Sequence, residues 1–255
     1  MLLLSVLPSI ILFIVIWRSD KIEKEPPKLL VKLFFLGFLT IISAMLIETI
    51  GGDYIFGFMD KSSILYQFIE NFLIVAVAEE GGKYLVLKKV TWKHPAFNYT
   101  FDAIVYSVTV SLGFATPENI LYLMDGDLST AIMRALFSVP GHVIYAIYMG
   151  FYFGLAKHAE AYNDMRLRNK NLKKAYIIPV LMHGFYDFCL NPDQVVLLLS
   201  FLVFEVVITI LAIKKIRRLS NIRAEIPGQG GEIVVADQMP STISESDNTY
   251  MEVQK

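Results

Sequence analysis

The chain has 255 residues, of which 55% are hydrophobic and only 18% are charged, and its mean hydropathy is +0.52. Soluble domains carry about a quarter charged residues, so this composition indicates a protein of the lipid bilayer. The net charge of −1 gives no sign of nucleic-acid binding. The single cysteine, Cys189, excludes an intramolecular disulfide and a multi-thiolate metal site, and we expect it to be a small apolar core residue.

Seven stretches of the sequence are long enough to cross a bilayer, which takes about 20 residues of helix. They cover residues 1–17, 29–50, 64–87, 101–124, 130–156, 175–190 and 195–213. The first stretch has no basic residues at its start and no clear cleavage site before Arg18, so we expect an uncleaved span. The sequence therefore predicts an all-α, polytopic membrane protein with about seven transmembrane helices.

Basic residues alternate along the connecting segments. Segments 18–28, 88–100 and 157–174, and the residues directly after 213, are rich in lysine and arginine. Segment 51–63 carries only Lys61, and segments 125–129 and 191–194 carry no basic residue. The positive-inside rule then places the N-terminus outside and the C-terminus in the cytoplasm. We expect residues 1–218 to form one transmembrane domain and residues 219–255 a disordered cytoplasmic tail.

Two adjacent glutamates lie in the middle of the third stretch. Glu79 and Glu80 are followed by Lys83, at i+4 and i+3, so the lysine can neutralise either one. A charge at hydrocarbon depth costs roughly 2.5–3.5 kcal/mol per residue, which indicates a wet cavity, an ion path or chemistry. Adjacent residues diverge by about 100° around a helix, so we expect one glutamate to face a cavity and the other to pair. The alternative is an ion-paired packing cluster, in which one of the two carboxylates would have no cationic partner.

The fourth stretch combines a proline with polar residues. Pro117 cannot donate a hydrogen bond to the carbonyl of Gly113, which predicts a kink in this helix. Glu118 and Asn119 follow directly and indicate a polar pocket beside the kink. The alternative is a glutamate at a helix end that reaches toward the outer membrane interface.

The fifth and sixth stretches each contribute a histidine. His142 follows Pro140-Gly141 near the middle of the fifth stretch, and His183 lies one turn before Asp187 in the sixth. An aspartate at i+4 can orient the imidazole and hold its proton on one nitrogen. At 1.5 Å per residue, these side chains are predicted to meet in the central and outer half of the membrane. The other intramembrane acids have no companion motif, and we expect packing or interface roles for Glu48, Glu70 and Glu205.

Together these motifs resemble the PrsW family of bacterial intramembrane proteases, which is distantly similar to the CAAX prenyl endopeptidases. The resemblance covers about residues 60–190 and is carried by Glu79-Glu80-x-x-Lys83, Phe114-x-x-x-Glu118-Asn119, Pro140-Gly141-His142 and His183-Gly184-x-x-Asp187-Phe188. The chain departs from the family pattern where Asp102-Ala103 and Tyr106-Ser107 replace Asp-Gly and Tyr-Gly. We expect this departure to alter helix packing more than chemistry.

The resemblance implies a multi-pass enzyme of the bacterial cell membrane that acts as a site-1 protease. Such an enzyme cuts a single-pass membrane anti-sigma factor on its extracytoplasmic side during envelope or antimicrobial-peptide stress. A second intramembrane protease then completes the degradation and releases the sigma factor.

Peptide hydrolysis needs an activated water, a stabilised oxyanion and a proton for the leaving amine. The catalytic residues that we predict are Glu79, Glu80, Glu118, His142, His183 and Asp187, with Lys83 and Asn119 in support. In the route that we favour, Glu79 or Glu80 is the general base and His142 positions the water. Either the imidazole of His183, held by its aspartate, or the amide of Asn119 stabilises the oxyanion.

A zinc-dependent route uses the same residues. In this alternative, His142, His183 and Glu118 bind zinc, and a glutamate of the third stretch is the base. We favour the metal-free route because the chain has no H-E-x-x-H motif and no two histidines one turn apart.

Two alternatives are not enzymes. In a proton-coupled transporter the same acids and histidines would form a relay, but no inverted repeat is visible in the sequence. A non-catalytic membrane scaffold would keep the fold without the chemistry, and the complete set of acids and histidines argues against it.

Overall fold

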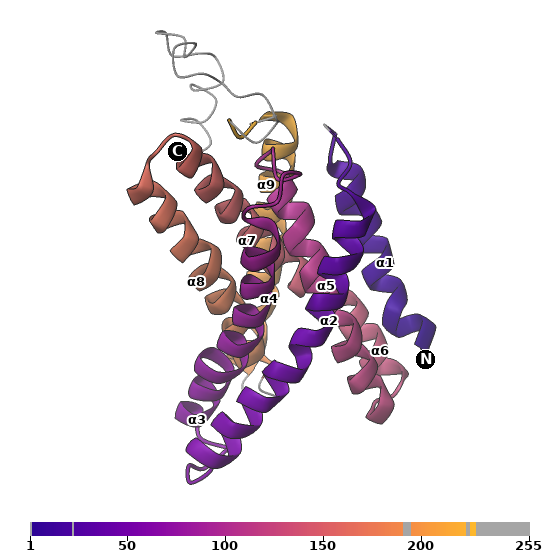
Figure 1. Cartoon of the computed structure of the whole chain (residues 1–255). Coiled ribbons are helices and arrows are strands. Elements are labelled where there is room, and N and C mark those ends of the chain that lie inside the picture. The colour runs from indigo at the N-terminus through magenta and orange to yellow at the C-terminus, as the bar shows by residue number, and fades with distance from the viewer. Residues whose placement is uncertain (1, 22, 191–194, 223–224, 228–255) are drawn as a thin grey trace, which may run out of the picture.

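The computed structural model describes residues 2–21, 23–190, 195–222 and 225–227. Over these residues the helices join into seven continuous rods that run alongside one another (Figure 1). The rods are α1 (Leu2–Ser19); α2 (Pro27–Thr49) with the π-helical turn η1 (Ile50–Ile55); α3 (Ile64–Phe68), η2 (Ile69–Val75) and α4 (Ala76–Thr91); α5 (Asp102–Asp125); α6 (Leu128–Met133), η3 (Arg134–Ser138) and α7 (Val139–Ala161); α8 (Met165–Cys189); and α9 (Val195–Ile222).

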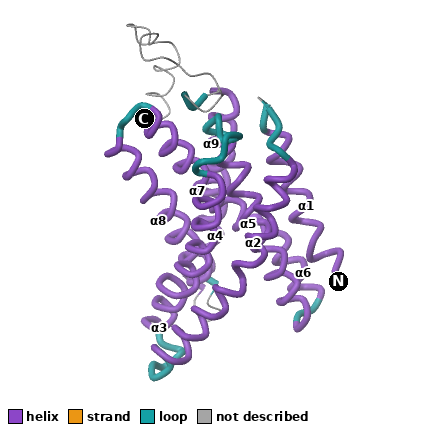
Figure 2. Tube along the Cα trace, viewed as in Figure 1, coloured by secondary structure: helices purple, strands orange, loops and turns teal. Residues whose placement is uncertain are grey.

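The rods follow the predicted stretches in number and order, and the all-α prediction is confirmed. Figure 2 shows short loops at the two ends of the bundle and helix between them. The sixth rod begins at Met165, earlier than predicted, because its basic first turns are helical although they are not apolar. Residues 219–222 of the predicted tail continue α9, and Ile226 is buried; residues 228–255 lie outside the described residues.

Length and composition allow three of these rods to cross a membrane: Pro27–Ile55, Leu128–Ala161 and Val196–Arg218. Ser5–Ser19 is a shorter apolar helix. Large apolar side chains point outward from the bundle, among them Phe35 on α2 and Val203 on α9. An outer surface of this kind is suited to lipid rather than water. The structure therefore supports a membrane protein.

The basic segments gather at one end of the bundle. In Figure 1 the α1–α2, α4–α5 and α7–α8 connections and the last turns of α9 lie at the top, whereas the α2–α3 and α5–α6 connections lie at the bottom. We call the top the basic end; the predicted orientation places it in the cytoplasm. The opposite end, which includes residues 56–63 and 126–127, is the predicted extracytoplasmic end.

Helix α5 is the centre of the bundle, and every residue from 101 to 117 is buried. Gly37 of α2 and Gly113 of α5 lie at a close crossing of these helices. A Cβ atom added at Gly37 would overlap the carbonyl oxygen of Val110, and one added at Gly113 would overlap that of Phe34. Small residues at such crossings let the backbones of membrane helices approach closely.

Ala103 and Ser107 lie in the contact between α5 and α7. A Cβ atom added at Gly150 of α7 would overlap atoms of Ala103, Ile104 and Ser107. The Ser107 hydroxyl donates a hydrogen bond to the carbonyl oxygen of Ala146 at 2.7 Å. The glycine that permits this approach is therefore on α7, and α5 uses its serine for an interhelical hydrogen bond. Ala103 and Ser107 both lie in this packing contact.

The loop between α1 and α2 is attached to α5 by a buried carboxyl group. Glu25, which lies outside the spans, accepts a hydrogen bond from the Tyr106 hydroxyl. Asp102 at the start of α5 accepts the backbone N–H groups of Asn98 and Tyr99 at 3.0 and 2.7 Å. Burial raises the pKa of Glu25 to about 7, so this group is partly protonated at neutral pH. These contacts fix the start of the central helix at the basic end.

The close crossing predicts that Gly113→Ala is destabilising. Alanine gains about 0.5–1 kcal/mol over glycine in helix propensity, but overlap with a backbone oxygen costs about 1–3 kcal/mol because the helices must separate. The apparent melting temperature in detergent should therefore fall. Gly52→Ala is the matched control, since its added Cβ would lie 3.4 Å from the nearest atom, the Tyr66 hydroxyl oxygen. Equal melting temperatures for the two variants would contradict the role of this crossing.

Candidate active site

Helix α4 brings three charged side chains together inside the bundle. The Nζ atom of Lys83 lies 2.8 Å from Oε1 of Glu80 and 3.2 Å from Oε2 of Glu79. All three residues are buried. The expectation that only one glutamate would pair is wrong: the side chains are long enough to converge on Lys83 although their Cα–Cβ bonds diverge.

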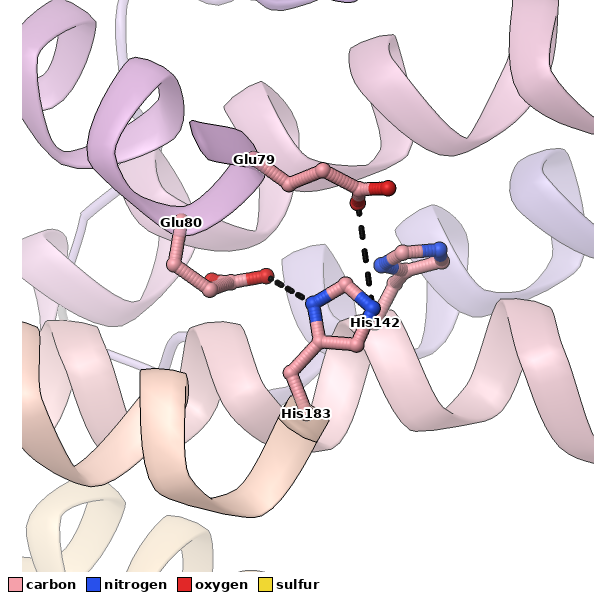
Figure 3. A group of neighbouring side chains, drawn as sticks. All are labelled: Glu79, Glu80, His142 and His183. Carbon is pink, nitrogen blue, oxygen red and sulfur yellow. Dashed lines mark hydrogen bonds and ion pairs between the residues drawn. The ribbon is translucent and has the colours of Figure 1, made fainter. Parts of the chain in front are cut away.

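Two histidines from other helices complete this group (Figure 3). Nδ1 of His183 on α8 lies 3.0 Å from Oε1 of Glu80. Nδ1 of His142 on α7 lies 3.1 Å from Nζ of Lys83. We call Glu79, Glu80, His142 and His183 the buried cluster, which joins α4, α7 and α8.

The second nitrogen of each histidine faces a further carboxylate. Nε2 of His142 lies 2.7 Å from Oε2 of Glu118, and Nε2 of His183 lies 3.1 Å from Oδ2 of Asp187. Because the Lys83 ammonium can only donate, Nδ1 of His142 accepts and Nε2 carries the proton that is donated to Glu118. Both histidines therefore have Nε2 held by a carboxylate from outside the cluster. Nδ1 faces Lys83 in His142 and Glu80 in His183, and Nε2 of His183 also lies 3.9 Å from Oε2 of Glu79.

Glu118 and Asn119 support the cluster through an arginine. Nη2 of Arg134 lies 3.0 Å from Oε1 of Glu118, and Nε of Arg134 donates to Oδ1 of Asn119 at 2.8 Å. The Asn119 amide also donates to the carbonyl oxygen of Ser5 at 2.8 Å, which ties α1 to α5. Asn119 is thus engaged in packing, and the predicted pocket beside Pro117 is built by Glu118. Helix α5 runs through Pro117 without interruption.

A cavity of about 640 Å³ opens beside the buried cluster. Its charged and phenolic lining is Glu48, Glu79, Glu118, Tyr122, Arg134, His142, Tyr145, His183, Tyr186 and Asp187. Among the described residues that line it, Glu79 is present and Glu80 is not. Other lining residues, such as Asn71 and Leu190, lie near the ends of their helices, away from the basic end. The cavity is therefore in the half of the bundle that is predicted to be extracytoplasmic.

Tyr145 is a cavity residue that the sequence reasoning missed. Its ring stacks on the ring of His183, with centroids 5.3 Å apart and an interplanar angle of 22°. Its hydroxyl oxygen is buried and has no hydrogen-bond partner among the described residues. A signal was present, because Tyr145 lies three residues after His142 and so shares a helix face with it.

Glu48 lines the cavity, whereas the sequence predicts a packing or interface role for it. No motif surrounds it in the sequence, and only the packing of α2 against the cluster brings it to the cavity. Glu70 agrees better with the expectation: its Oε1 accepts a hydrogen bond from the Tyr66 hydroxyl at 3.1 Å.

The buried cluster has the donor chemistry of a metal site. One donor atom from each of its four residues lies within 4.8 Å of the others, and zinc takes imidazole nitrogens and carboxylate oxygens. Oε2 of Glu80 is buried without a hydrogen-bond partner among the described residues, so an acceptor is left for a cation. Histidines held by an outer carboxylate are also the usual ligands of zinc. The donor set of the buried cluster fits a divalent ion, but it contains Glu79 and Glu80 in place of the predicted Glu118. The Lys83 ammonium now contacts three of these residues, so an ion that used the same donor atoms would have to displace it.

Comparison with known proteins gives one family. The profile described as "PrsW family intramembrane metalloprotease" matches residues 25–213. Proteins called "Protease PrsW" are similar over most of the chain: that of Oceanobacillus iheyensis is 34% identical over 85% of this chain and 94% of its own. Those of Bacillus subtilis and Clostridioides difficile are 33% and 31% identical, over 78% and 86% of this chain and 88% and 91% of their own. No solved structure matches. The chain belongs to the PrsW family of intramembrane proteases.

Proposed function

We propose that this protease makes the site-1 cut in a single-pass membrane anti-sigma factor, on the extracytoplasmic side of a bacterial cell membrane. The cavity carries this proposal, because Glu79, His142 and His183 open into the half of the bundle that lies away from the basic loops. The substrate class comes from the family resemblance. The protein crosses the membrane about seven times in this proposal, with its N-terminus outside and its C-terminus in the cytoplasm.

Glu79 is the general base. It lines the cavity, whereas Glu80 is enclosed and bound to both His183 and Lys83. A water molecule in the cavity gives its proton to the Glu79 carboxylate while its oxygen attacks the scissile carbonyl carbon. Glu79 then returns this proton to the leaving amine, so one carboxylate serves both proton transfers.

The donor set of the buried cluster and the word "metalloprotease" in the family description favour zinc over the metal-free route. Glu80, His142 and His183 would hold the ion and leave Glu79 toward the cavity. When bound, the ion would polarise the scissile carbonyl and make water a better nucleophile at neutral pH. Glu118, fixed by Arg134, keeps the Nε2 proton of His142 and so leaves a lone pair on Nδ1. This lone pair accepts from Lys83, which would have to release it to the ion.

Tyr145 is the oxyanion donor in this proposal. Tyr145 lines the cavity, its buried hydroxyl has no partner among the described residues, and its ring is fixed by stacking on His183. Gly141 leaves room beside it, since a Cβ there would lie 3.2 Å from the Tyr145 oxygen. A preorganised donor of this kind stabilises the charge that develops on the carbonyl oxygen. In this proposal Tyr145 takes the oxyanion-stabilising role for which the sequence offers His183 or Asn119.

The general-base proposal predicts that Glu79→Gln lowers cleavage by about 10²–10⁴-fold, because the amide cannot accept the proton of water. The assay is cleavage of a reconstituted single-pass anti-sigma factor in liposomes, with the cut mapped by mass spectrometry. Glu70→Gln on the same rod is the control and should cleave at the wild-type rate. Wild-type activity in Glu79→Gln would remove Glu79 as the base. A cut on the cytoplasmic side would refute the site-1 assignment.

The metal assignment predicts that a chelator abolishes cleavage and that added zinc restores it. Elemental analysis of the purified protein should find zinc in the wild type and in Glu79→Gln, but much less in Glu80→Gln and His142→Ala, which lose a donor. Glu70→Gln should keep its zinc. Full activity in protein shown to be free of metal would instead restore the metal-free route.

The oxyanion role predicts that Tyr145→Phe lowers kcat by about 10²–10³-fold, with KM, zinc content and melting temperature unchanged. The substitution removes one oxygen atom that has no hydrogen-bond partner among the described residues, so stability should not suffer. Tyr84→Phe, which removes a phenol oxygen from α4 outside the cavity, should leave kcat unchanged. A Tyr145→Phe enzyme with wild-type kcat, or one that loses zinc, would show that the hydroxyl is not the oxyanion donor.

A further inference from the structure

We propose that the basic end of the bundle contains a binding site for the headgroup of an anionic phospholipid, between α7, α8 and α9. This site is separate from the catalytic cavity and does not depend on the proposed reaction. It is a pocket of about 440 Å³.

The cationic lining of this pocket comes from two helices: Lys174 from α8, and Lys214, Lys215 and Arg218 from α9. No carboxylate is among the described residues that line it. In the described part of the chain, none of these four cations has an acidic group within ion-pairing distance. Over the described residues, the pocket is therefore a concentration of positive charge without an internal counter-ion.

Aromatic rings hold two of these cations in place. Nζ of Lys215 lies 3.8 Å from the centre of the Phe151 ring and 5.1 Å from that of Tyr148. Nζ of Lys174 lies 5.2 Å from the centre of the Tyr152 ring. Cation–π contacts orient an ammonium without neutralising it. The positive charge thus remains available to an anion in the pocket.

Asn171 gives an independent sign of a ligand. This residue lies three positions before Lys174 on α8, lines the pocket and is only 3% exposed. Its Nδ2 atom is buried with no hydrogen-bond partner among the described residues. Buried donors without partners are rare in folded proteins. A phosphate oxygen in the pocket would accept this hydrogen bond and the charge-assisted hydrogen bonds of the neighbouring lysines.

The surroundings of the pocket indicate a lipid rather than a soluble phosphate. Leu155 and Leu211 contribute apolar wall, and Leu211 is 43% exposed on α9, a helix that is apolar enough to cross the membrane. An acyl chain can therefore lie along α9 while its headgroup reaches the cations. The predicted orientation places the pocket in the cytoplasmic leaflet, where basic pockets between membrane helices bind anionic headgroups.

The test is lipid binding to the intact protein, measured by native mass spectrometry and by the immobilised fraction of spin-labelled lipid in bilayers. The wild type should bind phosphatidylglycerol in preference to phosphatidylcholine. Lys174→Gln/Arg218→Gln should weaken phosphatidylglycerol binding by about tenfold or more, because each lost cation near an anionic headgroup costs about fivefold. Asn171→Leu, which removes the amide but keeps its size, should also weaken it.

The matched control is Lys173→Gln/Arg217→Gln, which removes the same charge from neighbouring positions outside the pocket and should keep the preference. Equal losses in the two double variants would show surface attraction only and overturn the site. Displacement of the bound lipid by inorganic phosphate at equal concentration would also overturn it, in favour of a soluble anion. A wild-type protein that binds phosphatidylglycerol and phosphatidylcholine equally well would also overturn the proposed site.

Discussion

The architecture depends on a single constraint: charges buried within the bundle must neutralise one another. Lys83 lies between Glu79 and Glu80, and all three are buried. Removing one partner from such a group leaves an uncompensated buried charge, which costs several kcal/mol. The histidines of α7 and α8 complete the group, so the packing of α4, α7 and α8 is fixed by the same contacts that create the site.

The two glutamates of the buried cluster differ in their surroundings. Glu80 is enclosed and satisfies Lys83 and His183, whereas Glu79 opens to the cavity. Glu118 and Asp187 orient the two histidines by holding their Nε2 atoms, so Nδ1 faces Lys83 in His142 and Glu80 in His183. Glu79 also pairs with Lys83 through Oε2, but of the two glutamates it is the one that lines the cavity among the described residues. Family membership decides for a protease over the transporter and the scaffold that the sequence left open.

The sequence predicted the features that depend on local spacing and missed those that depend on tertiary contact. The lengths of the apolar stretches predicted the seven helical rods. The i+4 spacing of His183 and Asp187 predicted the contact between their side chains. Spacing on one helix did not reveal that both glutamates reach Lys83, because side-chain length overrides the divergence of their Cα–Cβ bonds. Glu48 carries no local signal at all, since it approaches the site only when α2 packs beside α4.

The buried cluster and the pocket at the basic end differ in how their positive charges are paired. The Lys83 cation at the buried cluster has two carboxylate partners. The pocket at the basic end, by contrast, leaves its cations without a carboxylate and the Asn171 amide without an acceptor among the described residues. The positive-inside rule explains lysines at that end but not a buried amide beneath them. Asn171 and His183 lie on the same helix, 12 residues and about 18 Å apart. An anion bound there would therefore brace α7, α8 and α9, two of which carry the histidines of the buried cluster.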